Sequence, residues 1–171
     1  MLWRMQLLWY RLDKVALAAA MVLAVVVGLL ASAAGAVFSQ RDAQQLAIRD
    51  FHARSLECLA LNVYYEARGE SLAGQYAVAE VTMNRKSAAR YPKTVCEVVY
   101  QKSAFSWTDE DVDHPRGAEW QRALRVAEEV YYQRREPKLP GVLHYHATHV
   151  RPAWSKERAR VARIGRHVFY R

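Results

Sequence analysis

Glu66 is the residue in this sequence whose type and position best suit acid–base chemistry. The apolar residues around it recur at the three- and four-residue spacing of a helix that buries one stripe: Leu56, Leu59, Ala60, Val63 and Ala67. Glu66 lies three positions after Val63, so its side chain projects from the buried side of that helix. A carboxylate there costs free energy unless it is paired, protonated or used in a reaction. Glu66 is therefore a candidate catalytic acid.

The predicted end of this helix bears on the charge of Glu66. Gly69 predicts a stop, which places Glu66 in the last turn. The carbonyl end of a helix disfavours negative charge and so favours the protonated, proton-donating carboxyl. Arg68 acts in the opposite direction, and the sequence leaves the balance open. On the local pattern alone, the alternative is an ordinary carboxylate paired with Arg68 or Arg85.

A longer pattern runs through the chain from this segment. Residues 64–70 read Tyr-x-Glu-Ala-Arg-Gly-Glu, and further matching segments lie at 74–85, 91–101, 105–107 and 164–170. Together they resemble the spore-cortex-lytic, or SleB-like, type of bacterial cell wall hydrolases, a lysozyme-like family. The matching segments occur in the same order over residues 56–170, so chance similarity is a poor explanation.

The resemblance implies a fold and a reaction. The expected fold is mainly α within an α+β class: a lysozyme-like helical domain with a small antiparallel β element. The implied substrate is the MurNAc-GlcNAc glycan strand of peptidoglycan, cut by a lytic transglycosylase. In such enzymes one glutamate, here Glu66, acts first as acid and then as base toward the 6-hydroxyl of the muramoyl sugar, which gives a 1,6-anhydro product. Glu70 and Glu80 are not obvious candidates for the second carboxylate that a classical glycosidase needs.

Aromatic and polar side chains are expected to line the sugar groove beside Glu66. The candidates for substrate binding are Tyr65, Gln75, Phe105, Ser106, Trp107, Tyr145 and His146. The alternative for any one of them is packing in the core, and for Phe105 in particular. We expect Arg68 and Arg85 to brace the helix pair rather than to orient Glu66.

A rival reading of the chemistry rests on His144, His146 and His149. His-x-His on a strand points both rings to one face, a spacing that zinc sites use. This alternative predicts a zinc-dependent wall amidase or peptidase, but no second half of a zinc motif is present. We therefore expect no metal and no cofactor. A further alternative is a catalytically silent wall-binding scaffold.

Charge and hydropathy indicate where the protein works. The chain carries a formal charge of +8, from 25 Lys and Arg against 17 Asp and Glu. A basic surface suits an anionic partner such as nucleic acid, an acidic membrane face or the bacterial wall. The basic residues are scattered except over 151–166, which gives nucleic acid little support. The expected partners are peptidoglycan and the inner membrane, with no nucleic acid.

The N-terminal segment predicts a membrane anchor. Val15 to Gln40 carries no charge and is long enough to span a bilayer as a helix. The basic flank before it, with Arg4, Arg11 and Lys14, predicts a single pass with the C-terminal domain in the periplasm. Small-x-small sites at 31–33 and 34–36 leave open a cleaved signal peptide and export. An Ala-rich anchor that slips free is a third possibility.

The remaining elements follow from periodicity, turn residues and breakers. We expect a signal or transmembrane segment at 1–38, a linker or stalk helix at 39–55 and the catalytic domain at 56–171. Within the domain the predictions are a helix from a Ser71 cap to Ala89, a short helix at 94–101, a loop at 103–117, an amphipathic helix at 118–135, a strand at 142–148 and a hairpin at 161–170. A strand is the alternative for 94–101.

The chain holds two cysteines, Cys58 and Cys96. In an exported domain such a pair is most simply a disulfide, which would be worth about 3–4 kcal/mol by loop entropy. Two buried free thiols are the alternative.

Overall fold

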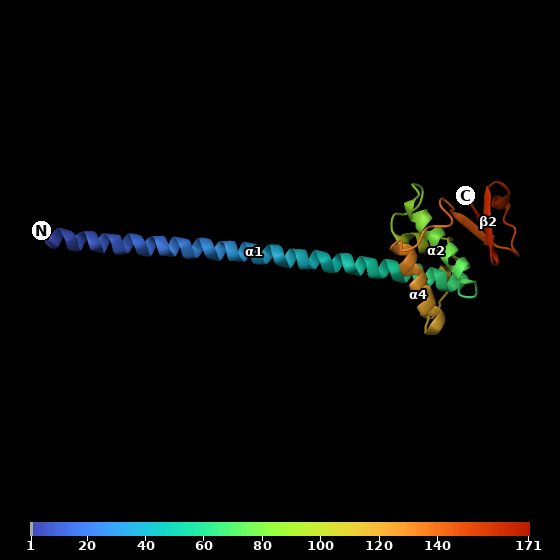
Figure 1. Cartoon of the computed structure of the whole chain (residues 1–171), viewed down its shortest axis with the longest axis horizontal. Helices are drawn as coiled ribbons and strands as arrows, with labels where there is room; N and C mark the ends of the chain where they lie inside the picture. Colours follow the sequence, from blue (N-terminus) through green and yellow to red (C-terminus); the bar gives the residue numbers. More distant parts are fainter. Residues whose placement is uncertain (1) are drawn as a thin grey trace. The chain divides into compact units, whose positions relative to one another are not determined.

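The computed structural model describes the backbone of residues 2–171 and the side chains from Lys14 onward (Figure 1). The chain divides into two compact units, Met1–Arg49 and Asp50–Arg171. The side chains of the basic flank at Arg4 and Arg11 lie outside the described residues.

Helix α1 covers Leu2–Ala67, and the division between the two units falls within it. Among the described residues, one helix, from Lys14 on, is long and apolar enough to cross a membrane by length and composition. Its side chains from Val15 to Phe38 are exposed. The sequence predicts an apolar segment at 1–38 followed by a separate linker or stalk helix at 39–55. The structure has one helix because no proline occurs before residue 92 and the polar residues 39–55 are largely good helix formers.

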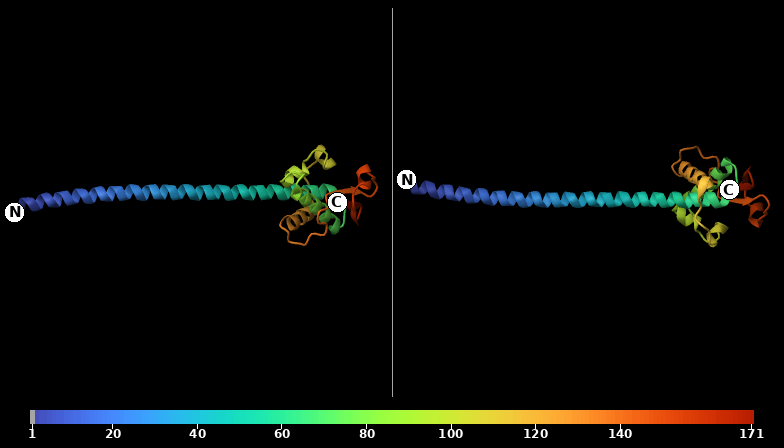
Figure 2. Two further views of the ribbon diagram at one scale, coloured as in Figure 1. Left: turned by 90° about the horizontal axis from the view of Figure 1, so that it is seen from above. Right: turned by 90° about the horizontal axis from the view of Figure 1, so that it is seen from below.

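The second unit gathers shorter helices around the C-terminal part of α1 (Figure 2). These are α2 (Leu72–Ser87), α3 (Val95–Val99), the 3-10 helix η1 (Ser106–Asp109) and α4 (Gly117–Tyr131). Ser71 caps α2 by accepting a hydrogen bond from the Gly74 amide, and a capping box opens α3. The main core includes Leu59, Val63, Val99, Val126 and Ala127. The apolar stripe predicted for the Glu66 helix is thus the face that packs.

A three-stranded antiparallel sheet completes the second unit. Strands β1 (His144–Ala147), β2 (Arg160–Ile164) and β3 (His167–Tyr170) lie in the order β1-β3-β2, and the 3-10 helix η2 (Ala153–Lys156) precedes β2. The sheet lies beyond the C-terminal end of α1 in both views of Figure 2. Phe169 on the central strand packs with residues of α2 in a second buried cluster. The predicted fold class, mainly helical with a small antiparallel sheet, is confirmed.

Two helices end earlier than the sequence predicted, and α2 is the first of them, with its end at Ser87 rather than near Ala89. Helix α4 ends at Tyr131 rather than at residue 135, because Gln133 adopts a φ of 53° and the amides of Gln133 and Arg134 bond back to the carbonyls of Val130 and Glu129. The predicted loop at 103–117 contains the 3-10 turn η1. The short helix at 94–101, the strand at 142–148 and the hairpin at 161–170 are present as α3, β1 and the β2–β3 pair.

Cys58 and Cys96 form a disulfide, with their Cα atoms 5.3 Å apart. It joins α1, about two turns before Glu66, to α3. The bridge therefore connects the helix that carries Glu66 to the segment that leads into the loop at 101–105.

Candidate active site

Glu66 occupies the last turn of α1 and faces a cavity of about 210 Å³. The cavity is lined by residues from α1, α2, the loop before η1 and the sheet: Glu66, Arg85, Ala104, Phe105, Ser106, Tyr145, His146, Ala147 and His167. The side chain is half-buried, neither sealed in the core nor directed into bulk water. The arrangement arises because the helix ends at the sheet, so its last turn meets β1.

The two carboxylate oxygens of Glu66 have different surroundings. The Tyr145 hydroxyl donates a hydrogen bond to Oε2 over 2.9 Å. Among residues 14–171 the Glu66 side chain makes no other hydrogen bond, so Oε1 is available to a ligand in the cavity. Burial raises the pKa of Glu66, and it outweighs the opposing effects of the Tyr145 hydrogen bond and the Arg85 charge. The carboxyl thus has the character of a general acid.

Arg85 on α2 serves both structure and site. Its Nε donates to the Leu143 carbonyl over 2.8 Å, which braces α2 against the segment that leads into β1. Its guanidinium lies 5.2 Å from the centre of the Phe105 ring, and it also lines the Glu66 cavity. The sequence predicted that Arg85 braces the helix pair, whereas this hydrogen bond joins α2 to the segment before β1. The same residue also supplies the positive charge that lowers the pKa of Glu66.

The two nearby glutamates are engaged elsewhere. Glu70 Oε1 lies 2.6 Å from Arg166 Nε, and Glu70 Oε2 accepts the Arg166 amide, which ties the α1–α2 turn to the β2–β3 turn. Glu80 accepts the amides of Lys138 and Leu139, both over 2.8 Å. Neither lines the cavity, so Glu66 is its one carboxylate among residues 14–171.

His167 at the start of β3 lines the same cavity and was not among the predicted site residues. The residue is buried, its ring centre lies 5.2 Å from that of Tyr145, and its Nδ1 has no hydrogen-bond partner in the described part of the chain. Burial lowers its pKa, so the imidazole is neutral at pH 7. The sequence placed His167 on a strand but held no signal that this strand is central.

The structure brings some of the predicted groove residues together and not others. Phe105, Ser106, Tyr145 and His146 line the Glu66 cavity. Trp107 does not; its indole Nε1 donates to Asn62 Oδ1 over 3.3 Å within the core. Gln75 lies apart as well, because it is 1% exposed and its amide bonds to the Glu70 carbonyl.

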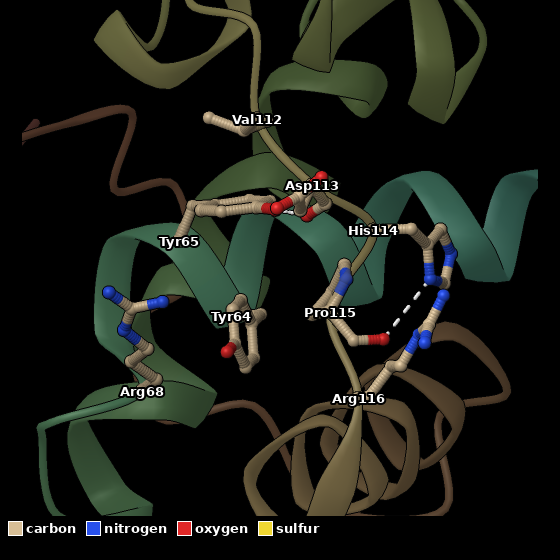
Figure 3. Close-up of a pocket in the computed structure, with 8 residues that line it drawn as sticks. All are labelled: Tyr64, Tyr65, Arg68, Val112, Asp113, His114, Pro115 and Arg116. Carbon is tan, nitrogen blue, oxygen red and sulfur yellow. Dashed lines mark hydrogen bonds between the residues drawn. The ribbon is translucent and has the colours of Figure 1, made fainter.

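Tyr65 faces a different cavity, of about 550 Å³ (Figure 3). Tyr64, Tyr65 and Arg68 come from the end of α1 and face the loop at 112–116. The Tyr65 hydroxyl donates to the Asp113 carbonyl, and its ring stacks on Trp107 with centres 4.8 Å apart. Glu66 does not line this larger cavity, so its size alone does not make it the reaction site.

A third cavity, of about 360 Å³, adjoins the one at Glu66. The two share Arg85, Ala104 and Tyr145. Ligand sites commonly occupy about 300–1,000 Å³, which the Glu66 cavity does not reach by itself. The two cavities lie on either side of these shared residues, and we call them together the Glu66 groove.

His144 and His146 do not form a metal-binding arrangement. Both rings contact Trp154, with centres 5.6 and 5.7 Å away, as expected for one face of a strand. His144 Nε2 lies 3.1 Å from an Arg90 nitrogen, and His146 contacts the Tyr170 hydroxyl. Burial and three arginines lower the pKa of His144 to about 4, an environment that would also repel Zn²⁺. Residues 14–171 contain no group of three potential ligands, His149 included.

Comparison with known proteins places this geometry in a family. A family model described as Cell Wall Hydrolase matches residues 69–170, which begins just after Glu66. The chain is 29% identical to the spore cortex-lytic enzyme of Oceanobacillus iheyensis over 117 residues, which cover 67% of this chain and 40% of that protein. It is 28% identical to the Bacillus subtilis enzyme over 119 residues, covering 70% and 38%. The chain thus spans about two fifths of the length of these relatives.

Two solved structures share the fold. The catalytic domain of the Bacillus cereus SleB protein matches with a TM-score of 0.53 at 26% identity, over 68% of this chain and 89% of that one. The catalytic domain of the germination-specific lytic transglycosylase SleB from Bacillus anthracis matches with a TM-score of 0.60 at 27% identity, over 68% and 93%. The family model covers more than half of the sequence, and these similarities agree with it. The chain belongs to the cell wall hydrolase family.

Proposed function

We propose that this chain cleaves the MurNAc-GlcNAc glycan strand of peptidoglycan as a lytic transglycosylase, with Glu66 as its catalytic residue. The observation that carries the proposal is a half-buried carboxyl with a raised pKa, held at one oxygen by Tyr145 and open at the other. Membership of the cell wall hydrolase family and similarity to a protein described as a lytic transglycosylase support the substrate class.

The absence of a second carboxylate from the groove favours transglycosylation over two-carboxylate hydrolysis. Inverting and retaining glycosidases place a second carboxylate at about 5–10 Å from the acid. Among residues 14–171, Glu66 is the one carboxylate that lines either cavity of the groove. Glu70 and Glu80 are held by backbone amides and arginines in structural roles. A mechanism in which one glutamate acts twice fits these residues.

The proposed reaction has two halves, both at Glu66. Glu66 first gives its proton to the glycosidic oxygen, and the bond from that oxygen to C1 of the muramoyl sugar breaks. The resulting carboxylate then takes the proton of the 6-hydroxyl on the same sugar, and that oxygen bonds to C1. The product is the 1,6-anhydro sugar, no water is consumed, and Glu66 ends the cycle protonated.

The neighbouring side chains fit this cycle. Tyr145 stays protonated, because burial raises its pKa well above its usual value, so its hydroxyl can stabilise the carboxylate form midway through the cycle. Arg85 adds positive charge on the same side. Phe105, Ser106, His146 and His167 surround the space beside Glu66 where a sugar ring would lie.

Digestion of purified peptidoglycan tests the proposal. We expect wild-type protein to release muropeptides with 1,6-anhydro ends, lighter by one water than hydrolysis products in mass spectra. Glu66→Gln should abolish the release. Tyr76→Phe, which alters a hydroxyl bonded to Glu129 outside the groove, is the matched control and should retain activity. Hydrolysed ends would refute transglycosylation; stem peptides or no release would refute glycan cleavage.

We further propose that residues 1–38 anchor the protein in the inner membrane and that residues 56–171 form the catalytic domain in the periplasm. Residues 39–55 would connect the anchor to the catalytic domain. The exposed apolar helix surface supports the anchor, and the break between compact units falls within the proposed linker. Fractionation with N-terminal sequencing is the test: full-length protein in the membrane is expected, and a soluble product that begins at residue 34 or 37 would indicate a cleaved signal.

A further inference from the structure

Four cations gather at the part of the Glu66 groove that lies farther from Glu66. We call Arg85, Arg90, Lys102 and Arg158 the cation cluster. Arg85 and Lys102 line the cavity of about 360 Å³, together with His144 and Trp154. The other two contact these rings: an Arg90 nitrogen lies 3.1 Å from His144 Nε2, and the Arg158 guanidinium lies 5.8 Å from the centre of the Trp154 ring.

The cation cluster has no carboxylate of its own. Elsewhere in the domain Arg134, Arg135 and Arg166 form ion pairs with glutamates. Within residues 14–171 none of the four cations of the cluster forms an ion pair with a carboxylate. The buried Nε of Arg158 also has no hydrogen-bond partner there.

Three arginines of the cluster also act on His144. After burial, the charges of Arg158, Arg85 and Arg90 lower the pKa of that imidazole to about 4. His144 is therefore neutral at pH 7 and adds no charge of its own. Like charges brought together without a counter-ion cost free energy, which a bound anion would recover.

The other lining groups indicate what kind of anion fits. Trp154 offers an aromatic face, and Gln101 and Ser103 offer polar side chains. Ser103 holds a φ of 60°, a conformation that non-glycine residues seldom adopt outside sites under constraint. Planar guanidinium groups match carboxylates by paired hydrogen bonds. The cavity thus suits a carboxylate-bearing chain.

The position of the cluster connects this anion to the substrate. The cavity shares Arg85, Ala104 and Tyr145 with the one at Glu66, so a strand bound for cleavage has its substituents within reach of the cluster. In peptidoglycan the anionic groups next to the sugars are the carboxylates of the stem peptide on the muramoyl residue.

We propose that the cation cluster binds stem-peptide carboxylates, so that the enzyme prefers peptide-bearing glycan strands over peptide-free ones. This inference rests on the proposed function, because it specifies the substrate of the same groove. It assigns Arg90, Lys102 and Arg158 to substrate selection, a role in which they contact the peptide and not the bond that breaks.

The test compares strands with and without stem peptides. Removing the peptide with an amidase frees the lactyl carboxylate of each muramoyl sugar, so the peptide-free strands keep one carboxylate per muramoyl sugar and lack those of the peptide. Peptidoglycan strands are used intact or after an amidase has removed their stem peptides, and release of 1,6-anhydro ends is followed at equal sugar concentration. We expect kcat/KM to be about tenfold higher on the peptide-bearing strands, as for one or two charge-assisted hydrogen bonds. The preference should shrink as salt is raised, because the contacts are partly exposed.

Variants at the cluster sharpen the comparison. Arg90→Gln and Arg158→Gln should each lower the ratio of kcat/KM between the two substrates about three- to tenfold. Arg125→Gln, an exposed arginine on α4 that lines neither cavity of the groove, removes the same charge and should leave the ratio unchanged. Melting temperatures of all three variants serve to show that they are folded.

The outcomes separate this inference from the proposed function. Equal kcat/KM on the two substrates, or a ratio that Arg90→Gln and Arg158→Gln leave unaltered, would overturn the peptide subsite while glycan cleavage stands. If neither substrate yields anhydro ends, or Glu66→Gln cleaves as well as wild type, the proposed function itself fails.

Discussion

Replacing Tyr145 with phenylalanine would remove the hydroxyl that donates to Glu66 Oε2 over 2.9 Å and leave the ring in place. That hydrogen bond stabilises the charged carboxylate and so lowers the pKa of Glu66, against the larger, raising effect of burial. Without it, burial is opposed by Arg85 alone, and the pKa of Glu66 rises further. The variant therefore changes the protonation of the proposed acid without touching the acid itself.

The size of the shift follows from the strength of the bond. A hydrogen bond to a charged group is worth about 1.5–3 kcal/mol, and one pKa unit corresponds to about 1.4 kcal/mol. Removal of the hydroxyl should thus raise the pKa of Glu66 by about one to two units. The reaction begins with protonated Glu66, so activity falls as pH rises through this pKa. The alkaline limb of the kcat/KM profile should move to higher pH by the same amount.

The assay is the release of 1,6-anhydro ends from soluble peptidoglycan fragments across a pH series. Besides the shift, we expect the maximal rate to fall about tenfold, because the carboxylate formed midway loses its donor. Tyr76→Phe is the matched control: it removes a hydroxyl bonded to Glu129 outside the groove and should leave the limb in place. If the alkaline limb of the Tyr145→Phe profile does not move, or moves to lower pH, protonated Glu66 is not the acid whose pKa Tyr145 lowers.

Three further predictions concern stability. Because the pKa of Glu66 is raised by folding, the contribution of this carboxyl to the free energy of unfolding is present at low pH and is lost as pH rises through the folded-state pKa. Glu66→Gln should therefore have a higher melting temperature than wild type at pH 7 and lose that advantage in acid. Calorimetry across a pH series measures both. Gly165→Ala should lower the free energy of unfolding in urea by about 2–3 kcal/mol, because φ is +56° and a Cβ would collide with the Glu70 carboxylate. The control is Gly117→Ala, at φ +82° with open space around it, which should cost only about 1 kcal/mol. Equal losses of stability in the two variants would contradict the collision at Gly165. Cys96→Ala removes the disulfide and should cost about 3–4 kcal/mol by the same measurement, whereas a loss below about 1 kcal/mol would show that the bridge adds little.

Local patterns in the sequence predicted the elements that carry the site. The apolar stripe and Gly69 indicated a helix ending just after Glu66, and α1 ends at Ala67. The turn at Gly165 indicated the hairpin, and β2 and β3 flank it. Each of these signals acts over a few residues, because periodicity and turn preference depend on the backbone nearby.

Contacts between side chains that are far apart in the sequence were harder to predict from it. Gln75 was expected in the groove but is buried at the joint between α1 and α2. His167 was not selected, although it lines the Glu66 cavity, because its place depends on β3 being the central strand. The sequence likewise left open whether burial or a nearby arginine governs Glu66, since burial depends on how the sheet closes over the helix end.

By itself, the sequence determined the apolar N-terminal helix, the helix that ends at Glu66, the short strands and the family resemblance. The tertiary structure alone decided that Tyr145 holds Glu66, that Glu70 serves the hairpin instead of the reaction, and that Arg90, Lys102 and Arg158 converge. The physical reason is range: helix and turn signals act between near neighbours, whereas burial and charge at a site sum over residues that only folding brings together.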